Sequence, residues 1–371
     1  MTTATAPAPA PALSAPAATG SARLRENLAK RQIPGLDALR AFAVLLVMAY
    51  HFGFTSIPGG YGVVAFFVLS GFLITWLLLK EQEATGTVSL RKFYIRRSLR
   101  IFPAFYAFWI LLVSALFVTG RHVPWDHAAS AFVYLSNYYN AIIGDPNSGF
   151  SHTWSLAIEE QFYLLWPAAF LLLIRQPRKM AGRLLGLILA VWLYRVVLVR
   201  VFAVDQGYIY AAFDTRFDAL LVGCLTAVLL HWKRAQRVTG WILAHPALAL
   251  LPLLGVVVLV MDLPFDIPRR RDIFGFALVP PLLALFMVQV IGFQGTRSWS
   301  WLEHPVLRFL GRISYPLYLY QQITLHMVRD ALAGWPVAVQ FAGACIVTVA
   351  VASASFYVLE QPFLRLKKRF G

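Results

Sequence analysis

The chain has 371 residues, of which 59% are apolar and only 13% are charged. Soluble globular domains carry about a quarter charged residues, so this composition excludes an ordinary soluble enzyme. The 28 Phe, 15 Tyr and 11 Trp residues also exclude a disordered chain, because disordered segments are poor in aromatic residues. The composition therefore predicts an integral membrane protein.

The formal net charge of +16 arises from 33 Lys and Arg residues against 17 Asp and Glu residues. The basic residues form short clusters between long apolar runs, which is typical of membrane topology and not of a nucleic-acid-binding face. The two cysteines, Cys224 and Cys345, lie in apolar stretches, and no Cys/His pair has the spacing of zinc ligands. We therefore expect no nucleic-acid partner, no disulfide framework and no metal.

The first 22 residues consist mainly of Ala, Pro, Thr and Ser and lack the charged start and apolar core of a signal peptide. We expect residues 1–32 to form a disordered Ala/Pro-rich tail that becomes basic and is cytoplasmic. Residues 33–365 are expected to form the transmembrane domain, and residues 366–371 a basic cytoplasmic tail.

Ten stretches are apolar and long enough to cross a bilayer, which takes about 20 residues per helix. They lie near residues 36–54, 62–79, 103–119, 153–174, 184–203, 216–231, 243–262, 273–291, 313–332 and 337–358. The expected fold class is therefore all-α, a polytopic membrane protein with about ten transmembrane helices.

Lys and Arg flanking the spans indicate their orientation, because cytoplasmic loops retain these residues. If both termini are cytoplasmic, 24 of the 33 basic residues fall on the inner side, so we predict this orientation in the cell membrane. Arg269–Arg271 is an exception on an outer loop: it binds lipid head groups or an anionic acceptor, or the seventh and eighth spans are misplaced. Residues 120–150 are expected to form an interfacial or re-entrant outer segment that could cover a site.

The first span contains ionisable side chains, which are costly within a bilayer and therefore indicate function. Arg40 and His51 fall within roughly 20° of each other on a helix and about 16 Å apart along its axis. Asp37 lies one turn before Arg40 and can pair with it. Two interpretations stay open: an inner ion pair with a separate hydrogen-bonding histidine, or a functional polar stripe.

The fourth span places His152, Ser155 and Glu159 on one helical face at positions i, i+3 and i+7, with Glu160 beside them. Because this helix enters from outside, we expect Glu159 at the depth of His51. A carboxylate and an imidazole could then meet.

The sixth and second spans add further polar positions. The sixth begins with Asp214, Arg216 and Asp218, and pairing of Arg216 with either aspartate is an alternative to substrate contact. Ser70 and Gly71 lie in the middle of the second span, where small residues favour close helix packing.

Tyr94, Arg96, Arg97 and Arg100 precede the third span on its inner side. Arg96 and Arg100 share a helical face at i, i+4, and the forked guanidinium suits phosphate groups. These arginines are either positive-inside charges or the cytoplasmic site of a phosphorylated ligand.

Together these segments resemble the acyltransferase-3 family of multi-span membrane O-acyltransferases, which includes bacterial O-antigen acetylases and macrolide acyltransferases. The resemblance covers residues 33–365. The matching motifs are Arg40 with His51, FFVLSGFLIT, FYIRRSLRIFP, HTWSLAIEEQFYLLWP, RFDALLVG, RISYPLYLY and LEQPF. One departure is Gln321, because family members often carry a histidine near this place.

The resemblance implies transfer of an acetyl or other short acyl group from acyl-CoA, as co-substrate, to a hydroxyl of a glycan, glycolipid, macrolide or related acceptor. It implies that Arg40 and His51 form the essential motif, that the arginines before the third span bind the donor, and that Glu159 is the acid of the fourth-span motif. Supporting or acceptor-side residues are Asp37, Ser70, His152, Trp154, Ser155, Glu160, Arg216, Asp218 and Gln321.

We therefore expect an acyl-CoA-dependent acyltransferase in which Arg96, Arg97 and Arg100, with Tyr94, bind the donor. His51 is expected to act as general base with Glu159 orienting it. The alternative is a transporter or proton-coupled carrier that uses the same intramembrane residues. The lack of a recognisable internal repeat counts against the carrier.

Overall fold

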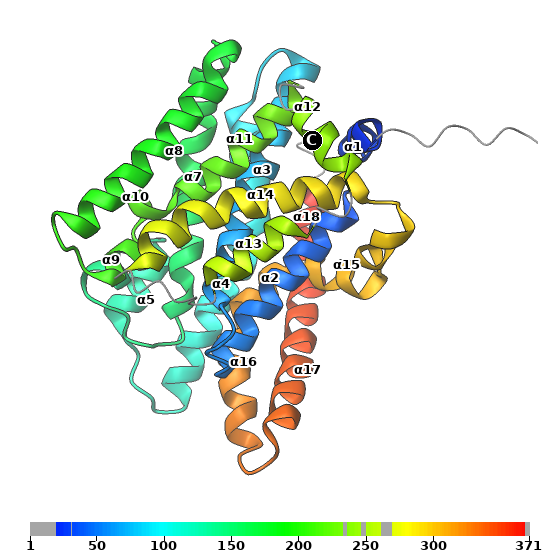
Figure 1. The fold of residues 1–371 in the computed structure, drawn as a ribbon. Helices are drawn as coiled ribbons and strands as arrows, with labels where there is room; N and C mark the ends of the chain where they lie inside the picture. The colour runs from blue at the N-terminus through cyan, green and yellow to red at the C-terminus, as the bar shows by residue number, and fades with distance from the viewer. Residues whose placement is uncertain (1–19, 31, 233–235, 246–249, 261–268, 368–371) are drawn as a thin grey trace, which may run out of the picture.

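The computed structural model describes residues 20–30, 32–232, 236–245, 250–260 and 269–367 (Figure 1). Within these ranges every regular element is a helix, which confirms the all-α class. The predicted disordered start up to residue 19 lies outside the described residues. Residues 20–29 form a helix that packs against α14, where Asn27 Nδ2 donates to the Ile291 carbonyl at 2.8 Å.

The described residues form a succession of helices. Their bounds are α1 Gly20–Ala29, α2 Pro34–Phe52, α3 Gly59–Thr85, α4 Leu90–Val118, α5 Trp125–Phe132, α6 Ser136–Ile142, η1 Ser151–Thr153, α7 Trp154–Ile174, α8 Pro177–Arg200, α9 Gln206–Ala211, α10 Phe213–Arg216, α11 Asp218–His231, α12 Gln236–Ala244, α13 Leu251–Val260, η3 Arg271–Gly275, α14 Phe276–Phe293, η4 Arg297–Glu303, α15 Pro305–Arg312, α16 Ser314–Ala331, α17 Val337–Ser355, η5 Phe356–Glu360 and α18 Gln361–Lys367.

Within the described residues, seven helical segments are long and apolar enough to cross a membrane. They contain α2, α3, α4, α7, α8, α14 and α17, and each overlaps a predicted span. Helix α11 is apolar but shorter, α16 carries polar residues along its length, and the predicted span 243–262 is divided between α12 and α13. These helices support a multi-pass membrane protein, whereas the count of ten spans and the sides of the termini stay predictions.

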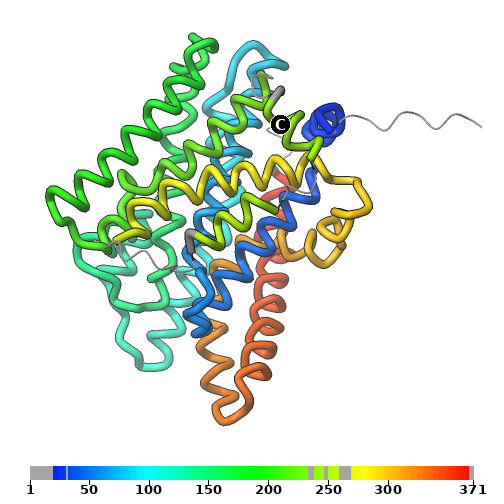
Figure 2. Tube along the Cα trace, viewed as in Figure 1, coloured from blue at the N-terminus to red at the C-terminus, as the bar shows by residue number. Residues whose placement is uncertain are grey.

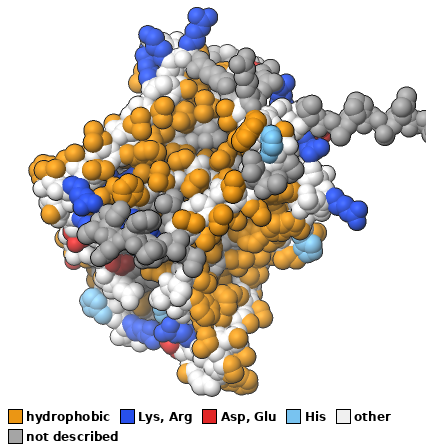
Figure 3. All heavy atoms as spheres, in the orientation of Figure 1, with side chains coloured by type: hydrophobic (Ala, Val, Ile, Leu, Met, Phe, Trp, Pro, Cys, Tyr) orange, Lys and Arg blue, Asp and Glu red, His pale blue; other side chains and the backbone are white. Residues whose placement is uncertain are grey.

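The surface has the distribution expected of such a protein. In the view of Figure 3, apolar side chains cover the broad middle of the face, and Lys and Arg lie mainly toward its upper and lower ends and its edges. Large apolar side chains such as Leu193 and Ile346 are 65% and 69% exposed.

Helix α3 is packed closely between α2 and α11. A Cβ atom at Gly71 would collide with the Leu220 carbonyl oxygen, and one at Gly223 would collide with the Val68 carbonyl oxygen. The two backbones therefore touch where each helix has a glycine, which confirms the close packing predicted for the middle of the second span.

Helices α16 and α17 form a hairpin that extends beyond the rest of the bundle (Figures 1 and 2). Helix α16 also packs against α2, and α15 crosses the start of α2. A Cβ at Gly311 of α15 would collide with the Asp37 carbonyl, so this crossing is also a backbone contact. The polar residues of α2 and α16 are thereby brought together.

Residues 120–150 contain α5 and α6, which have only 8 and 7 residues and are too short to span. We call residues 120–150 the cap, because they pack over α4 and α7. Trp109 Nε1 of α4 donates to the Ala128 carbonyl at 2.8 Å, and Gln161 Nε2 of α7 donates to the Tyr134 carbonyl at 2.9 Å. The start of the fourth predicted span is buried beneath this cap, since His152 is only 2% exposed. The prediction that this segment does not span is confirmed.

The cap has one buried histidine of its own. The His127 ring stacks on Tyr139 with centroids 4.8 Å apart, and its Nδ1 lies 2.9 Å from Ser148 Oγ. Burial lowers the pKa of His127 below its ordinary value, so the ring is neutral near pH 7.

Candidate active site

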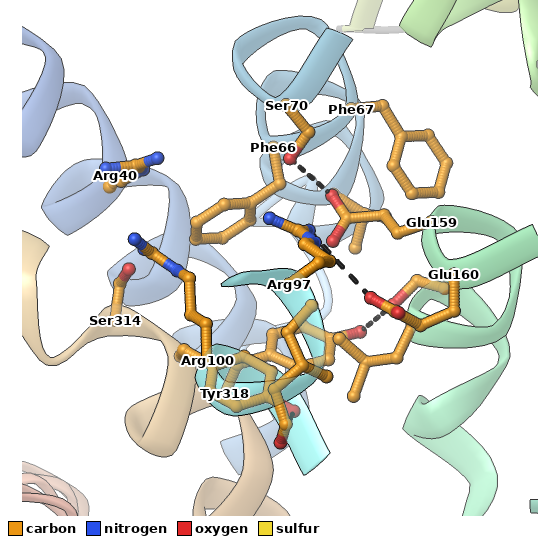
Figure 4. Close-up of a pocket in the computed structure, with 15 residues that line it drawn as sticks. Arg40, Phe66, Phe67, Ser70, Arg97, Arg100, Glu159, Glu160, Ser314 and Tyr318 are labelled. Carbon is orange, nitrogen blue, oxygen red and sulfur yellow. Dashed lines mark hydrogen bonds and ion pairs between the residues drawn. The ribbon is translucent and has the colours of Figure 1, made fainter. Parts of the chain in front are cut away.

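A polar cavity of about 90 Å3 lies among α2, α3, α4, α7 and α16 (Figure 4). Its volume accommodates about three water molecules at roughly 30 Å3 each. Its polar lining consists of Arg40, Ser70, Arg97, Arg100, Ser155, Glu159, Glu160, Ser314, Tyr315 and Tyr318. Many of these residues were predicted as site residues, and the fold brings them together from five helices.

Glu159 is held in the cavity by α3. Its Oε1 accepts a hydrogen bond of 2.7 Å from Ser70 Oγ, as the dashed line in Figure 4 shows. Ser70 is thus part of the site, while its neighbour Gly71 makes the backbone contact with α11. Gly71 thus makes the close packing that the sequence predicts, and Ser70 lines the cavity.

The three arginines of the cavity have different surroundings. Arg97 lies 3.8 Å from Glu160 and places its guanidinium 3.4 Å from the centroid of the Tyr163 ring. Arg40 lies 3.6 Å from Asp37, which confirms the pair predicted one turn apart. Among the residues that the structure describes, no carboxylate lies within ion-pairing distance of Arg100, which leaves this cation for an anionic group.

Two of the predicted donor residues do not line the cavity. Arg96 pairs with Glu81 at the end of α3, at 2.7 Å, and the Tyr94 hydroxyl donates to the Leu164 carbonyl at 2.8 Å. Residues i and i+4 share a helical face but lie about 6 Å apart along the axis, so Arg96 meets α3 while Arg100 reaches the cavity. The prediction that Arg96 and Arg100 act together is therefore wrong for this cavity.

His51 lies near the other end of α2 and contacts α16. The side-chain amide of Gln321, which is fully buried, lies 2.7 to 3.0 Å from His51 Nδ1. Gln321 stands where family members often carry a histidine, and here it holds the imidazole of the predicted base.

The expected contact between Glu159 and His51 is wrong in this structure. Glu159 forms a hydrogen bond with Ser70, and His51 forms one with Gln321. The hydroxyls of Ser155 and Tyr318, 2.6 Å apart, line the same cavity as Glu159. Depth counted from a helix end assumes that the end lies at the surface. The cap buries the start of α7, so the position of Glu159 along the helix does not give its depth.

His152 has a structural environment. Its Nδ1 lies 2.7 Å from Gln322 Oε1, and its Nε2 lies 3.1 Å from the Leu319 carbonyl oxygen. Both ring nitrogens contact α16, so His152 joins η1, which precedes α7, to α16. Adjacent glutamines of α16 thus contact two histidines, one from α2 and one from η1.

Arg216 and Asp218 do not pair with each other. Asp218 binds Arg195 of α8 at 2.8 Å, with both side chains 2% exposed or less, and also accepts from Trp192 Nε1 at 2.9 Å. The Arg216 guanidinium lies 3.6 Å from the centroid of the Phe276 ring. Residues two apart do not face each other on a helix, so the alternative in which Arg216 pairs with Asp218 is wrong.

Arg195 is a residue that the sequence analysis missed. Its signal was a cation inside an apolar run of the fifth predicted span, LYRVVLV. Asp214, the other predicted partner of Arg216, instead accepts from the hydroxyls of Tyr138 and Tyr194 at 3.2 and 3.0 Å.

The triple arginine has a buried counterion nearby. Arg269 Nε lies 2.9 Å from Asp272 Oδ2, and Arg271 Nε lies 3.6 Å from Asp272 Oδ1, with Asp272 fully buried. One carboxylate, that of Asp272, therefore forms ion pairs with two of the three arginines. Among the described residues, no three His, Cys, Asp or Glu side chains gather as a metal site requires.

Comparison with known proteins identifies the family of the chain. The family described as "Acyltransferase domain" matches residues 33–357. The peptidoglycan O-acetyltransferase OatA of Listeria monocytogenes is 31% identical over 360 residues, which cover 90% of this chain and 56% of that protein. A Bacillus subtilis protein, YrhL, provisionally named a peptidoglycan O-acetyltransferase, is 33% identical over 355 residues, which cover 90% of this chain and 55% of that protein.

A Staphylococcus aureus protein provisionally named an O-acetyltransferase is 32% identical over 351 residues, which cover 90% of this chain and 57% of that protein. The chain thus spans a little over half the length of these relatives. No solved structure matches the chain. Since the family match extends over most of the sequence, the chain belongs to the acyltransferase-3 family of multi-pass membrane acyltransferases.

Proposed function

We propose that the protein is an O-acetyltransferase that moves an acetyl group from acetyl-CoA to a hydroxyl of a glycan, with peptidoglycan as the leading acceptor. The observation that supports it most is the position of Arg40 and His51 at opposite ends of one helix. Arg40 lines the arginine-rich cavity, and His51 is held outside it by Gln321. The names of the relatives support the acetyl group and the glycan.

The donor binds through Arg97 and Arg100 in this proposal. Guanidinium groups bind phosphate in a forked geometry, and acyl-CoA carries phosphates at the end remote from its thioester. The predicted cytoplasmic location of the start of α4 places these arginines on the side where acyl-CoA is made. Arg100, which has no carboxylate partner among the described residues, contributes most to this binding.

His51 accepts the proton of the acceptor hydroxyl. In the tautomer that this step uses, Nδ1–H donates to the Gln321 amide oxygen, 3.0 Å away, and the lone pair of Nε2 is free for the hydroxyl. The hydroxyl oxygen forms a bond to the thioester carbonyl carbon, the carbon–sulfur bond breaks, and the proton passes from His51 to the departing thiolate. Gln321 replaces Glu159 as the orienting residue of our sequence-based prediction.

The carrier alternative gains no support from the comparisons, because the matched family is one of acyltransferases. The same buried polar residues are accounted for by transfer chemistry. We therefore retain a single function.

The test is acetyl-CoA consumption by the purified full chain in nanodiscs with a soluble glycan acceptor. His51→Ala should abolish acceptor-dependent consumption, whereas His122→Ala, at an exposed loop position, should leave it unchanged. Equal turnover of His51→Ala and wild type would overturn the base assignment. A wild-type protein that consumes no acetyl-CoA with any hydroxylated acceptor would overturn the function.

A further inference from the structure

A second cavity, with a volume of about 440 Å3, lies between the cap and the starts of α7 and α9. Ligand-binding pockets of proteins are typically about 300–1,000 Å3, so its size suits a small molecule or one unit of a polymer. Its floor is buried at Ala141 and Ala211, and its rim is exposed at Asp145 and Asp205. The cavity is therefore open at one side and closed below.

The lining of this cavity combines aromatic rings with carboxylates, which can accept hydrogen bonds from the hydroxyls of a ligand. The Trp154 and Tyr210 rings lie with centroids 4.8 Å apart at an interplanar angle of 48°, and both line the cavity. Two carboxylates, Asp145 and Asp205, stand at its rim. An aromatic surface beside carboxylates fits a sugar ring, which has an apolar C–H face and hydroxyls at its edge.

A buried cation, Arg216, packs against Trp154 and Tyr210, which together we call the aromatic wall of the cavity. The Arg216 guanidinium, 1% exposed, lies 5.4 Å from the Tyr210 centroid and 5.9 Å from the Trp154 centroid while it stacks on Phe276. Such contacts with aromatic rings are stabilising, and most so when desolvated. Arg216 is thus a positioning residue for the wall.

The cavity is adjacent to the proposed base. Tyr50, the residue before His51, packs against the start of α3, where a Cβ at Gly59 would collide with Tyr50 Cβ. The Tyr50 ring is 5.7 Å from the His51 ring, and a Cβ at Gly60, near Tyr50, would lie 3.2 Å from the Tyr210 hydroxyl. These contacts place the wall of the cavity and the imidazole in one neighbourhood.

The cavity is also adjacent to the arginine-rich one. Trp154 lines the second cavity, and Ser155, the next residue of α7, lines the first. The same turn of α7 therefore forms part of both walls. A ligand in the second cavity and a donor in the first would approach each other across this turn.

We propose that the second cavity is the acceptor subsite, in which a sugar ring of the glycan stacks on Trp154 and Tyr210 and donates hydroxyl hydrogen bonds to Asp145 and Asp205. This inference rests on the proposed function, since it assigns the acceptor of that reaction to a place. It gives Trp154 and Arg216 roles that the sequence left open.

The test measures binding of a soluble probe, tetra-N-acetylchitotetraose, to the full chain in nanodiscs by saturation-transfer NMR and calorimetry, without donor. Trp154→Ala should weaken binding at least about fivefold, as expected for a lost stacking surface. Asp205→Asn, which keeps the capping bond to the Gly207 amide, should also weaken it. Trp125→Ala, at an exposed position of the cap, is the matched control and should bind as wild type does.

Acetyl-CoA affinity, measured for each variant, shows whether the variant is folded. Equal probe affinity in wild type, Trp154→Ala and Asp205→Asn would overturn the subsite, as would a wild-type protein that consumes acetyl-CoA with this probe yet shows no saturation transfer from it. Probe binding that depends on Trp154 in a protein that never consumes acetyl-CoA would instead overturn the proposed function and keep the sugar site.

Discussion

Replacing Gln321 by leucine tests the central contact of the proposed mechanism. Gln321 is fully buried on α16, and its amide is within hydrogen-bond distance of His51 Nδ1. Leucine has a similar volume and no polar atom. The substitution therefore removes the group that fixes the ring and its tautomer, with little change of packing.

The size of the effect follows from the geometry. Nδ1 of a partly buried imidazole loses its hydrogen-bond partner, and leaving such a group unsatisfied costs about 1–3 kcal/mol. If this cost falls on the transition state, in which the imidazole takes up the proton, the rate falls about 5- to 150-fold at 1.36 kcal/mol per tenfold. We expect the loss in kcat, with the KM for acetyl-CoA unchanged, because the proposed donor arginines line the arginine-rich cavity and Gln321 does not.

The neighbouring glutamine provides the control. Gln322 makes the same kind of contact with His152, which the proposal treats as structural. Gln322→Leu should lower the melting temperature in nanodiscs more than it lowers kcat, and Gln321→Leu should do the reverse. If Gln321→Leu retains wild-type kcat while it remains folded, Gln321 does not orient the base and the reasoning is refuted.

Other substitutions test the remaining contacts. Arg100→Ala should raise the KM for acetyl-CoA about tenfold or more, as expected for loss of a charge-assisted contact of about 1.5–3 kcal/mol. Arg96→Ala should have little effect on this KM. Equal effects of the two substitutions would show that Arg96 also binds the donor. Asp218→Asn leaves Arg195 buried without its counterion and should lower the free energy of unfolding by about 3–5 kcal/mol. At an unfolding entropy of about 2.1 cal/mol/K per residue, this lowers Tm by about 4–6 °C. An unchanged Tm would contradict the buried pair. Gly71→Val should reduce the yield of folded protein because the side chain meets the Leu220 carbonyl, and normal yield and Tm would show that α3 can move away from α11.

The features that the sequence predicts well are local ones. Apolar runs located the seven long helices, and helix geometry alone placed Asp37 one turn from Arg40, where the structure has them 3.6 Å apart. Glycine in the middle of a span correctly indicated backbone contact. These properties depend on a few neighbouring residues or on one helix.

The features that it misses depend on how helices meet. The partner of Asp218 comes from α8, and the partner of His51 comes from α16, 270 residues away in sequence. The depth of Glu159 could not be counted along α7, because a cap from another part of the chain buries the start of that helix. Tertiary packing decided each of these contacts.

The shared turn of α7 has a kinetic consequence. Trp154 and Ser155 are joined by one peptide bond and serve different cavities, so a displacement of a few tenths of an ångström at one is transmitted to the other. Occupancy of either cavity would then change the affinity of the other by the same factor, as linkage requires. Initial-rate plots against donor and acceptor concentration should therefore intersect, as in a sequential mechanism, and acceptor analogues should alter the dissociation constant of acetyl-CoA measured at equilibrium.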